Sequence, residues 1–403
     1  MSEMAPAVRG DLEFFPVQYE GKQLVLIRDH LGLVQEGKAI EMPLYQFMTL
    51  LDGTRDVRDL QMIMIRQQGG VLVGIDEVKR VLAHFDEAFI LDSERFREAK
   101  DHIVEDFVAR SVRPCSHCGK SYPADATQLE RRLDDILSSQ PPVAQPDGKV
   151  VALVSPHIDL SVGERGYAST YQSLKYSSPS RVVLLGVGHQ MAQDLFCLTE
   201  KHFETPLGIV KTDKALVRKL REVGGDAVAA NDFTHRSEHS IEFQLLFLQH
   251  LLKGAAFTIV PILCGFIRTC LPEFSRKAYL EKTRPFLEAL KEILSEGENL
   301  VVAGVDFSHV GPKFGHQLTA HQLTGRSESH DKNLLASLAV LDAEQLWEES
   351  KRVGEQFNVC GFSALALLLE VLPKCKGQIL HHETWREEAT QSAVSFASVV
   401  FTT

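Results

Sequence analysis

The stretch VVALVSPHIDL (150–160) decides how the larger part of this 403-residue sequence folds. Its apolar run is typical of a buried strand, and Pro156 ends the run because proline has no N–H to donate to a sheet. His157 therefore opens a loop at the carboxyl end of a predicted strand. Taken alone, such a histidine is more often an ordinary hydrogen-bonded or surface residue than a functional one.

The same pattern occurs twice more. The run RVVLLGVGHQ (181–190) places His189 after an apolar strand, and NLVVAGVDFSHVG (299–311) places Asp306 and His309 after another. Ligands of parallel sheets bind outside the carboxyl ends of the strands. The three strand-end histidines are therefore predicted to converge on one metal or acid/base site.

Strands and helices alternate from residue 150 onward, which predicts an α/β fold whose sheet is covered by helices on both faces. The expected strands are 150–155, 181–187, 257–263, 300–305 and 391–401. The expected helices are 213–223, 240–252, 282–295, 328–338, 343–351 and 361–371.

A smaller module is predicted for residues 1–97, followed by a connecting segment over 98–149 and the α/β domain over 150–403. The module should contain a β-hairpin and three amphipathic helices, because its apolar residues recur at helical spacing after a first alternating stretch. These elements are expected at 22–36, 43–52, 56–67 and 75–91. The connecting segment should hold a helix at 127–138 and then a proline-rich linker.

Composition limits the classes of partner and compartment. The net charge of −11 argues against nucleic acid or an anionic membrane as the main partner, since both favour a basic surface. The first 22 residues contain acidic side chains and no long apolar core, so we expect neither a secretory signal nor a membrane helix, and a cytoplasmic protein. The seven cysteines are then expected to be free thiols, and the pair Cys115-Ser-His-Cys118, with no second such pair, to be structural or redox-inert.

Two further segments carry chemistry-bearing side chains. In SEHSIEFQLLFLQHLL (237–252), Ser240 fits a helix N-cap. Glu238 and His239 lie just before the predicted helix start, where they either belong to a functional site or form a simple capping motif. Cys360 lies at another predicted helix start, which would lower the pKa of its thiol; the alternative is a small buried residue. Two imidazoles and one thiolate suit zinc, copper or iron, and spacing alone does not choose among them.

Taken in order, seven motifs resemble the Memo family, also described as the B component of the AmmeMemoRadiSam system, over residues 111–401. They are CGKSYP (118–123), SPHIDL (155–160), GVGH (186–189), SEHSIEFQLLFLQ (237–249), VDFSHVG (305–311), NVCGF (358–362) and SAVSFAS (392–398). The series LVLIRDHLGLV, LYQFMTLLDGTRDVRDL and VKRVLAHFDEAFIL, within residues 1–97, is similar to PqqD-like domains, the winged-helix-like modules that hold leader peptides.

The Memo resemblance implies a fold like the catalytic subunit of class III extradiol dioxygenases, with a central mixed sheet flanked by helices. It implies that His157, His189 and Cys360 ligate iron or copper. His309 matches the acid/base position of those dioxygenases, and Asp306 and His239 are expected to line the same pocket as further candidate catalytic residues. The sequence departs from the family at Ser121, which stands before Tyr122 where many members carry an aromatic residue. It departs from the dioxygenases at Cys360, which stands where they use a carboxylate as the third ligand.

Three hypotheses of function follow. The first is a non-haem metalloprotein that binds Fe(II) or Cu, with zinc also compatible, and carries out O2 or small-molecule redox chemistry as a dioxygenase-like oxidoreductase. The second is a non-catalytic module that binds a small molecule or peptide and acts with a radical-SAM protein through residues 1–97. The third is a structural metal position or an inactive remnant of such a site.

Overall fold

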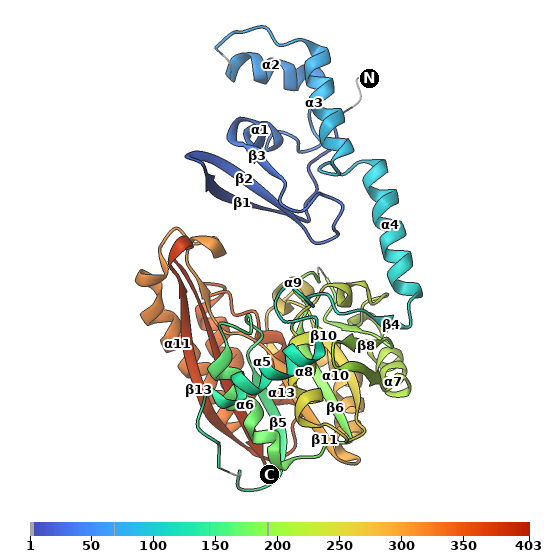
Figure 1. Cartoon of the computed structure of the whole chain (residues 1–403), viewed down its shortest axis with the longest axis vertical. Coiled ribbons are helices and arrows are strands. Elements are labelled where there is room, and N and C mark those ends of the chain that lie inside the picture. The colour runs from blue at the N-terminus through green and yellow to red at the C-terminus, as the bar shows by residue number, and fades with distance from the viewer. Residues whose placement is uncertain (1–3, 68, 145, 192) are drawn as a thin grey trace. The chain divides into compact units, whose positions relative to one another are not determined.

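The computed structural model describes residues 4–67, 69–144, 146–191 and 193–403. The chain forms two compact units, an N-terminal unit of residues 1–109 and a C-terminal unit of residues 110–403 (Figure 1). No described helix has the length and apolar character needed to cross a bilayer.

The N-terminal unit has a three-stranded antiparallel sheet and four helices around its own apolar core. Its elements are β1 (Leu12–Tyr19), β2 (Lys22–Asp29), β3 (Ala39–Glu41), α1 (Met42–Met48), α2 (Val57–Gln67), α3 (Ile75–Glu87) and α4 (Glu94–Ala109). The hairpin predicted at 22–36 is wrong: β2 pairs with the preceding β1, and Gly21 at φ 75° makes the turn between them. The winged-helix relation of this unit stays a prediction.

The C-terminal unit contains an eleven-stranded mixed sheet, which confirms the predicted architecture of a large mixed sheet flanked by helices. Its strands are β4 (Val112–Arg113), β5 (Val150–Ser155), β6 (Arg181–Val187), β7 (Phe196–Leu198), β8 (His202–Thr205), β9 (Gly208–Thr212), β10 (Thr258–Cys264), β11 (Asn299–Gly304), β12 (His309–Val310), β13 (Lys376–Glu387) and β14 (Ser392–Thr402). The main strand order is β12-β14-β5-β11-β6-β10-β9-β8-β4.

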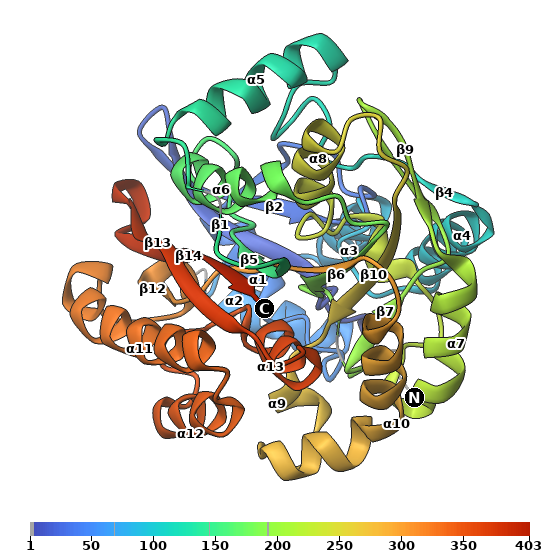
Figure 2. The ribbon, with the colours of Figure 1, turned by 90° about the horizontal axis from the view of Figure 1, so that it is seen from below.

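Helices cover the two faces of this sheet over two separate apolar cores. The helices are α5 (Ala126–Ser138), α6 (Glu164–Tyr171), α7 (Lys214–Gly224), α8 (Glu242–Leu251), α9 (Ile267–Cys270), α10 (Arg276–Ser295), α11 (Ala320–Val340), α12 (Ala343–Val353) and α13 (Phe362–Val371). Figure 2 shows α5, α6 and α8 on one side of the sheet and α10 to α13 on the other.

The register of the central strands places the predicted site. Strand β11 lies between β5 and β6 and is parallel to both, so the chain leaves all three at the same edge. His157, His189 and Asp306 follow these three strands directly. The sequence patterns therefore located this edge of the sheet correctly.

Several elements differ from the sequence prediction. Helix α10 begins at Arg276 rather than 282, because Ser275 caps it by accepting a hydrogen bond from the Ala278 N–H. Helix α11 begins at Ala320 rather than 328, at a capping box formed by Thr319 and Gln322. Strand β13 was not predicted, because its half-buried, mixed sequence lacks a clear apolar period; within the described residues this strand pairs with β14 alone.

Candidate metal centre

His157 is held rigidly at the end of β5. Its ring is buried, and its Nδ1 lies 2.9 Å from the Gly304 carbonyl oxygen at the end of β11. Its backbone N–H donates to Asp306 Oδ1 at 3.0 Å. The carbonyl partner makes Nδ1 the protonated nitrogen, so Nε2 carries the lone pair that a metal needs.

His189 is held in the same manner by a different group. Its Nδ1 lies 3.0 Å from Glu238 Oε2, and its backbone N–H donates to the same oxygen at 3.1 Å. Because Nδ1 is engaged, Nε2 is the nitrogen of His189 left for a metal.

Cys360 completes the group from the loop before α13. Its Sγ lies 3.5 Å from His157 Nε2, and one ligand atom from each of His157, His189 and Cys360 lies within 4.8 Å of the other two. Bonds of about 2.0 Å to nitrogen and 2.3 Å to sulfur, meeting at a tetrahedral angle, separate the two ligand atoms by about 3.5 Å. The residues therefore fit a metal ion that accepts nitrogen and thiolate ligands.

Glu238 and His239 offer a second set of ligands with the same His189. Both oxygens of Glu238 are already used: Oε2 by His189, and Oε1 by the Ser240 N–H at 2.9 Å and by His239 Nδ1 at 3.3 Å. This carboxylate acts as a support behind the imidazoles, so the group of His157, His189 and Cys360 is the better ligand set.

Gly186, Gly304 and Ser240 are small, which lets β6, β11 and the segment before α8 approach one another. A Cβ on Gly186 would lie 2.6 Å from Ser240 Oγ, and a Cβ on Gly304 would lie 2.7 Å from Gln244 Nε2. Ser240 is not the predicted N-cap, because α8 begins one residue later than such a cap requires, after Ile241. Its hydroxyl instead bonds both backbone groups of Val187, at 3.0 and 3.1 Å, and fixes the 238–241 segment to β6.

The charge states of the imidazoles differ. Burial lowers the pKa of His157 to about 3, so it is neutral and ready to donate its lone pair. Burial also opposes the charged form of His189, but the adjacent Glu238 carboxylate outweighs it and raises the pKa of His189 well above its usual value. Burial lowers the pKa of His239 well below the usual range.

Cys360 departs from its predicted electrostatics. Burial raises the pKa of its thiol and outweighs the hydrogen bond to His189 that favours the thiolate. The helix start predicted to lower this pKa therefore does not dominate. The thiol must lose its proton when it binds a metal.

Asp306 and His309 lie beside this group. Burial raises the pKa of Asp306 to about 6, partly offset by the charge of His309, and burial lowers the pKa of His309. The His309 Nδ1 lies 3.0 Å from the Phe307 carbonyl oxygen, and its ring contacts Phe314 edge-on. The raised pKa of Asp306 and the lowered pKa of His309 bring the two groups closer together in acidity, which suits proton transfer.

The structure adds His117 to the residues singled out from the sequence. The rings of His117 and His239 lie 5.5 Å apart, and His239 in turn lies 5.1 Å from His157 and 5.0 Å from His189. No spacing in the sequence relates residue 117 to the strand ends. Only its place inside the Cys-Ser-His-Cys motif marked it.

Beneath His117, the carboxylate of Glu242 is fully buried and accepts several hydrogen bonds. The Arg113 guanidinium donates to it at 2.5 Å, and the backbone N–H groups of Ser116 and His117 donate at 3.1 and 2.9 Å. The hydroxyl of Tyr122 donates to it as well, so this aromatic ring points into the core.

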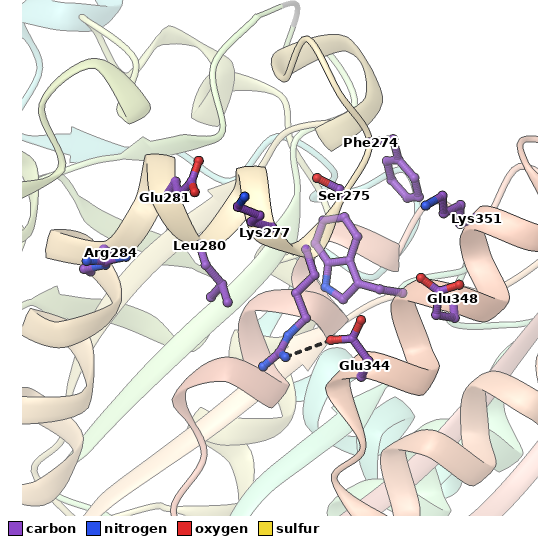
Figure 3. Close-up of a pocket in the computed structure, with 11 residues that line it drawn as sticks. Phe274, Ser275, Lys277, Leu280, Glu281, Arg284, Glu344, Glu348 and Lys351 are labelled. Carbon is purple, nitrogen blue, oxygen red and sulfur yellow. Dashed lines mark hydrogen bonds and ion pairs between the residues drawn. The ribbon is translucent and has the colours of Figure 1, made fainter.

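A separate pocket of about 340 Å³ opens between the start of α10 and α12 (Figure 3). Arg276 pairs there with Glu344 at 3.0 Å, and Trp347 forms part of the wall. None of the residues predicted for the metal site lines this pocket, so it plays no part in the site.

The chain is similar in sequence to proteins of one known family. Residues 113–400 match the family model described as Memo-like protein. A MEMO1 family protein of Aquifex aeolicus (strain VF5) is 30% identical over 403 residues, covering 99% of this chain and all of the relative. MEMO1 family proteins of Thermus thermophilus and Thermococcus kodakarensis are each 27% identical, covering 82% and 72% of this chain and 94% and 99% of their own lengths.

Proposed function

Because the chain belongs to the Memo family, we propose that its C-terminal unit is a non-haem metal centre in which His157, His189 and Cys360 bind Fe(II) or Cu. One observation carries the proposal: each imidazole is fixed through Nδ1, by Gly304 or Glu238, and its Nε2 is left for the ion beside the Cys360 sulfur. Histidines that bind a metal through one ring nitrogen are typically held by a hydrogen bond at the other.

The bound ion would supply one-electron and O2 chemistry, for which imidazole and thiolate ligands are suited. The chain's own contribution is proton handling and positioning. The pKa of Asp306 is raised to about 6 and that of His309 is lowered, and we assign these two groups the exchange of protons with a bound small molecule. His239 is neutral and lies against both imidazole ligands, where it can position a polar substrate atom.

The fold relation to class III extradiol dioxygenases belongs to this proposal and is supported by the strand-end positions of His157, His189 and His309. Cys360 in place of a carboxylate favours general redox chemistry over catechol ring cleavage, because a thiolate donates more charge and is itself oxidised.

The test is the metal content of anaerobically purified protein, measured by mass spectrometry for the wild type, His157→Ala and Cys360→Ser. About one iron or copper per chain is expected in the wild type and little in either variant. His321→Ala and Cys375→Ser serve as matched controls, since His321 is exposed and Cys375 is only partly buried. Full metal content in His157→Ala would contradict the assignment.

A second candidate function, binding of a peptide or of a radical-SAM protein by the N-terminal unit, is favoured by the coverage of the relatives. The Thermococcus kodakarensis relative matches over 99% of its own length but covers only 72% of this chain, whereas the Aquifex aeolicus relative covers 99%. The N-terminal unit is thus an addition found in some relatives. Equal recovery of a radical-SAM protein by the full chain and by a chain lacking residues 1–97 would remove this candidate.

A further inference from the structure

Cys115 and Cys118 lie on a tight turn next to the candidate metal centre. The turn continues through hydrogen bonds from the Lys120 and Ser121 N–H groups to the His117 carbonyl oxygen, both at 3.0 Å. Gly119 adopts a φ of 76°, which a residue with a side chain rarely adopts. Both cysteines are free and partly exposed, so a small reagent can reach them from solvent.

The turn is fixed from below. The two residues between the cysteines, Ser116 and His117, donate their backbone N–H groups to the buried carboxylate of Glu242. The Ser116 hydroxyl also donates to this carboxylate at 2.7 Å. A turn fixed in this way limits the conformations of the segment that carries the two thiols, which lowers the entropic cost of joining them.

The two thiols interact directly. Burial raises the pKa of Cys115 to about 12, and the hydrogen bond that the Cys115 S–H donates to the Cys118 sulfur and the charge of Glu242 act in the same direction. Cys115 therefore keeps its proton, which makes it a poor nucleophile.

A zinc site is the usual alternative for two cysteines at this spacing. Among the residues that the structure describes, the groups of three or more metal-ligating side chains contain neither Cys115 nor Cys118. No third or fourth ligand of a structural zinc site therefore lies with the pair in the described part of the chain, which favours thiol chemistry.

We propose that Cys115 and Cys118 form a redox-active pair that reduces a hydroperoxide and closes to a disulfide, with Cys118 attacking and Cys115 resolving. The Cys118 thiolate attacks the terminal peroxide oxygen and breaks the O–O bond. This forms a sulfenic acid on Cys118 and releases water or an alcohol once the leaving oxygen takes up a proton. The Cys115 sulfur then attacks the Cys118 sulfur, the S–S bond forms, and the hydroxyl leaves as water with the Cys115 proton.

The two electrons that reduce the peroxide come from the two thiols, so the step needs no metal. An external dithiol restores the reduced pair by exchange. The pair brackets His117, whose ring contacts that of His239, so the disulfide would form beside the proposed metal centre.

The test uses the reduced full-length chain, treated with hydrogen peroxide, alkylated and digested with trypsin. Residues 111–120, SVRPCSHCGK, form one tryptic peptide with both cysteines, because trypsin does not cut between Arg113 and Pro114. We expect this peptide to become two hydrogens lighter and resistant to alkylation. The rate of this change should be at least about tenfold higher than the rate at which Cys270 and Cys375 are oxidised. Those two cysteines are also partly exposed and provide the internal reference.

Two variants assign the roles. In Cys115→Ser the reaction should stop at a sulfenic acid on Cys118 that dimedone traps, and in Cys118→Ser the remaining thiol should oxidise no faster than Cys375. Rapid sulfenic acid formation on Cys115 in Cys118→Ser would overturn the assignment of the attacking thiol. Wild-type protein that oxidises Cys270 and Cys375 while the 111–120 peptide remains alkylated would overturn the proposal itself.

A parallel sample treated with a chelator separates this proposal from the metal centre. Closure at the wild-type rate without metal is the expected result. Closure that requires added iron or copper would overturn the proposal, because the thiols would then be oxidised by a species formed at the metal and not by the hydroperoxide directly.

Discussion

His189 Nδ1 lies 3.0 Å from Glu238 Oε2, and this contact between strand β6 and the segment before α8 fixes one ligand of the proposed centre. The carboxylate keeps the ring oriented and raises the basicity of the nitrogen that faces the ion. It also favours the protonated ring when no metal is bound. Glu238 therefore influences both the affinity of the site and its dependence on pH.

Glu238→Gln should weaken metal binding by roughly 10- to 100-fold, which is the usual loss when a partner of a ligating histidine is removed. The amide still fills the space but no longer supplies charge to His189. Competition titration with a chelator of known affinity measures the change. Glu298→Gln, an exposed glutamate paired with Lys149, is the matched control. Unchanged affinity in Glu238→Gln would show that this contact does not serve the metal.

The metal affinity should rise with pH between about pH 6 and 8. His189 and Cys360 both have raised pKa values, so each holds a proton that binding must displace. Release of two protons gives a slope of about two in log affinity per pH unit. Isothermal titration in buffers of different ionisation enthalpy counts the protons released.

The same measurement on Glu238→Gln tests the cause. Without the carboxylate, the pKa of His189 should fall and the slope should drop toward about one. A wild-type affinity that does not change with pH would contradict the predicted protonation of both ligands.

Glu242→Ala should destabilise the C-terminal unit by about 3–5 kcal/mol, because it leaves the buried guanidinium of Arg113 without its carboxylate. Tyr122→Phe should cost less, about 1.5–3 kcal/mol, since only one hydrogen bond to the charge is lost. Urea unfolding followed by tryptophan fluorescence reports on this unit, because both tryptophans, Trp347 and Trp385, lie in it. Equal stability of all three proteins would refute a supporting role of the network.

The pH dependence of this stability has a definite sign. Burial opposes the charge on Glu242, but Arg113 and the surrounding donors outweigh it and hold the pKa of the carboxyl well below its usual value. Its stabilising contribution is therefore present above the unfolded pKa of about 4.3 and is lost as the pH falls through the lower folded value. The acid limb of the stability curve should be shallower in Glu242→Gln than in the wild type.

Arg9→Ala should destabilise the N-terminal unit by about 3–5 kcal/mol without affecting metal content. The side chain of Arg9 is fully buried, donates to Asp29 at 2.8 and 3.2 Å, and lies 4.0 Å from the centre of the Phe96 ring. Its loss leaves a buried carboxylate unpaired. Hydrogen exchange should increase throughout residues 12–109 and stay unchanged in the C-terminal unit. Loss of metal in this variant would show that the two units depend on each other.

The sequence alone determined the central strands and the residues that leave them. Uninterrupted apolar runs ending in Ser-Pro-His, Gly-Val-Gly-His and Gly-Val-Asp fixed β5, β6 and β11, because a fully buried parallel strand allows few other compositions. Once three such strands are parallel, His157, His189 and Asp306 must emerge at one edge. The motif around Cys360 added the thiol through its resemblance to a known family.

Tertiary structure alone decided which side chains support these residues. Glu238 turns back toward β6 only because Ser240 bonds the Val187 backbone, and His117 reaches the site only because Glu242 fixes its turn from a helix more than a hundred residues later. Burial also raised the pKa of Cys360, whereas its position at a helix start predicted a lowered pKa. These contacts join segments far apart in the sequence, so no local period or spacing records them, and only the packing of the sheet and its helices brings them together.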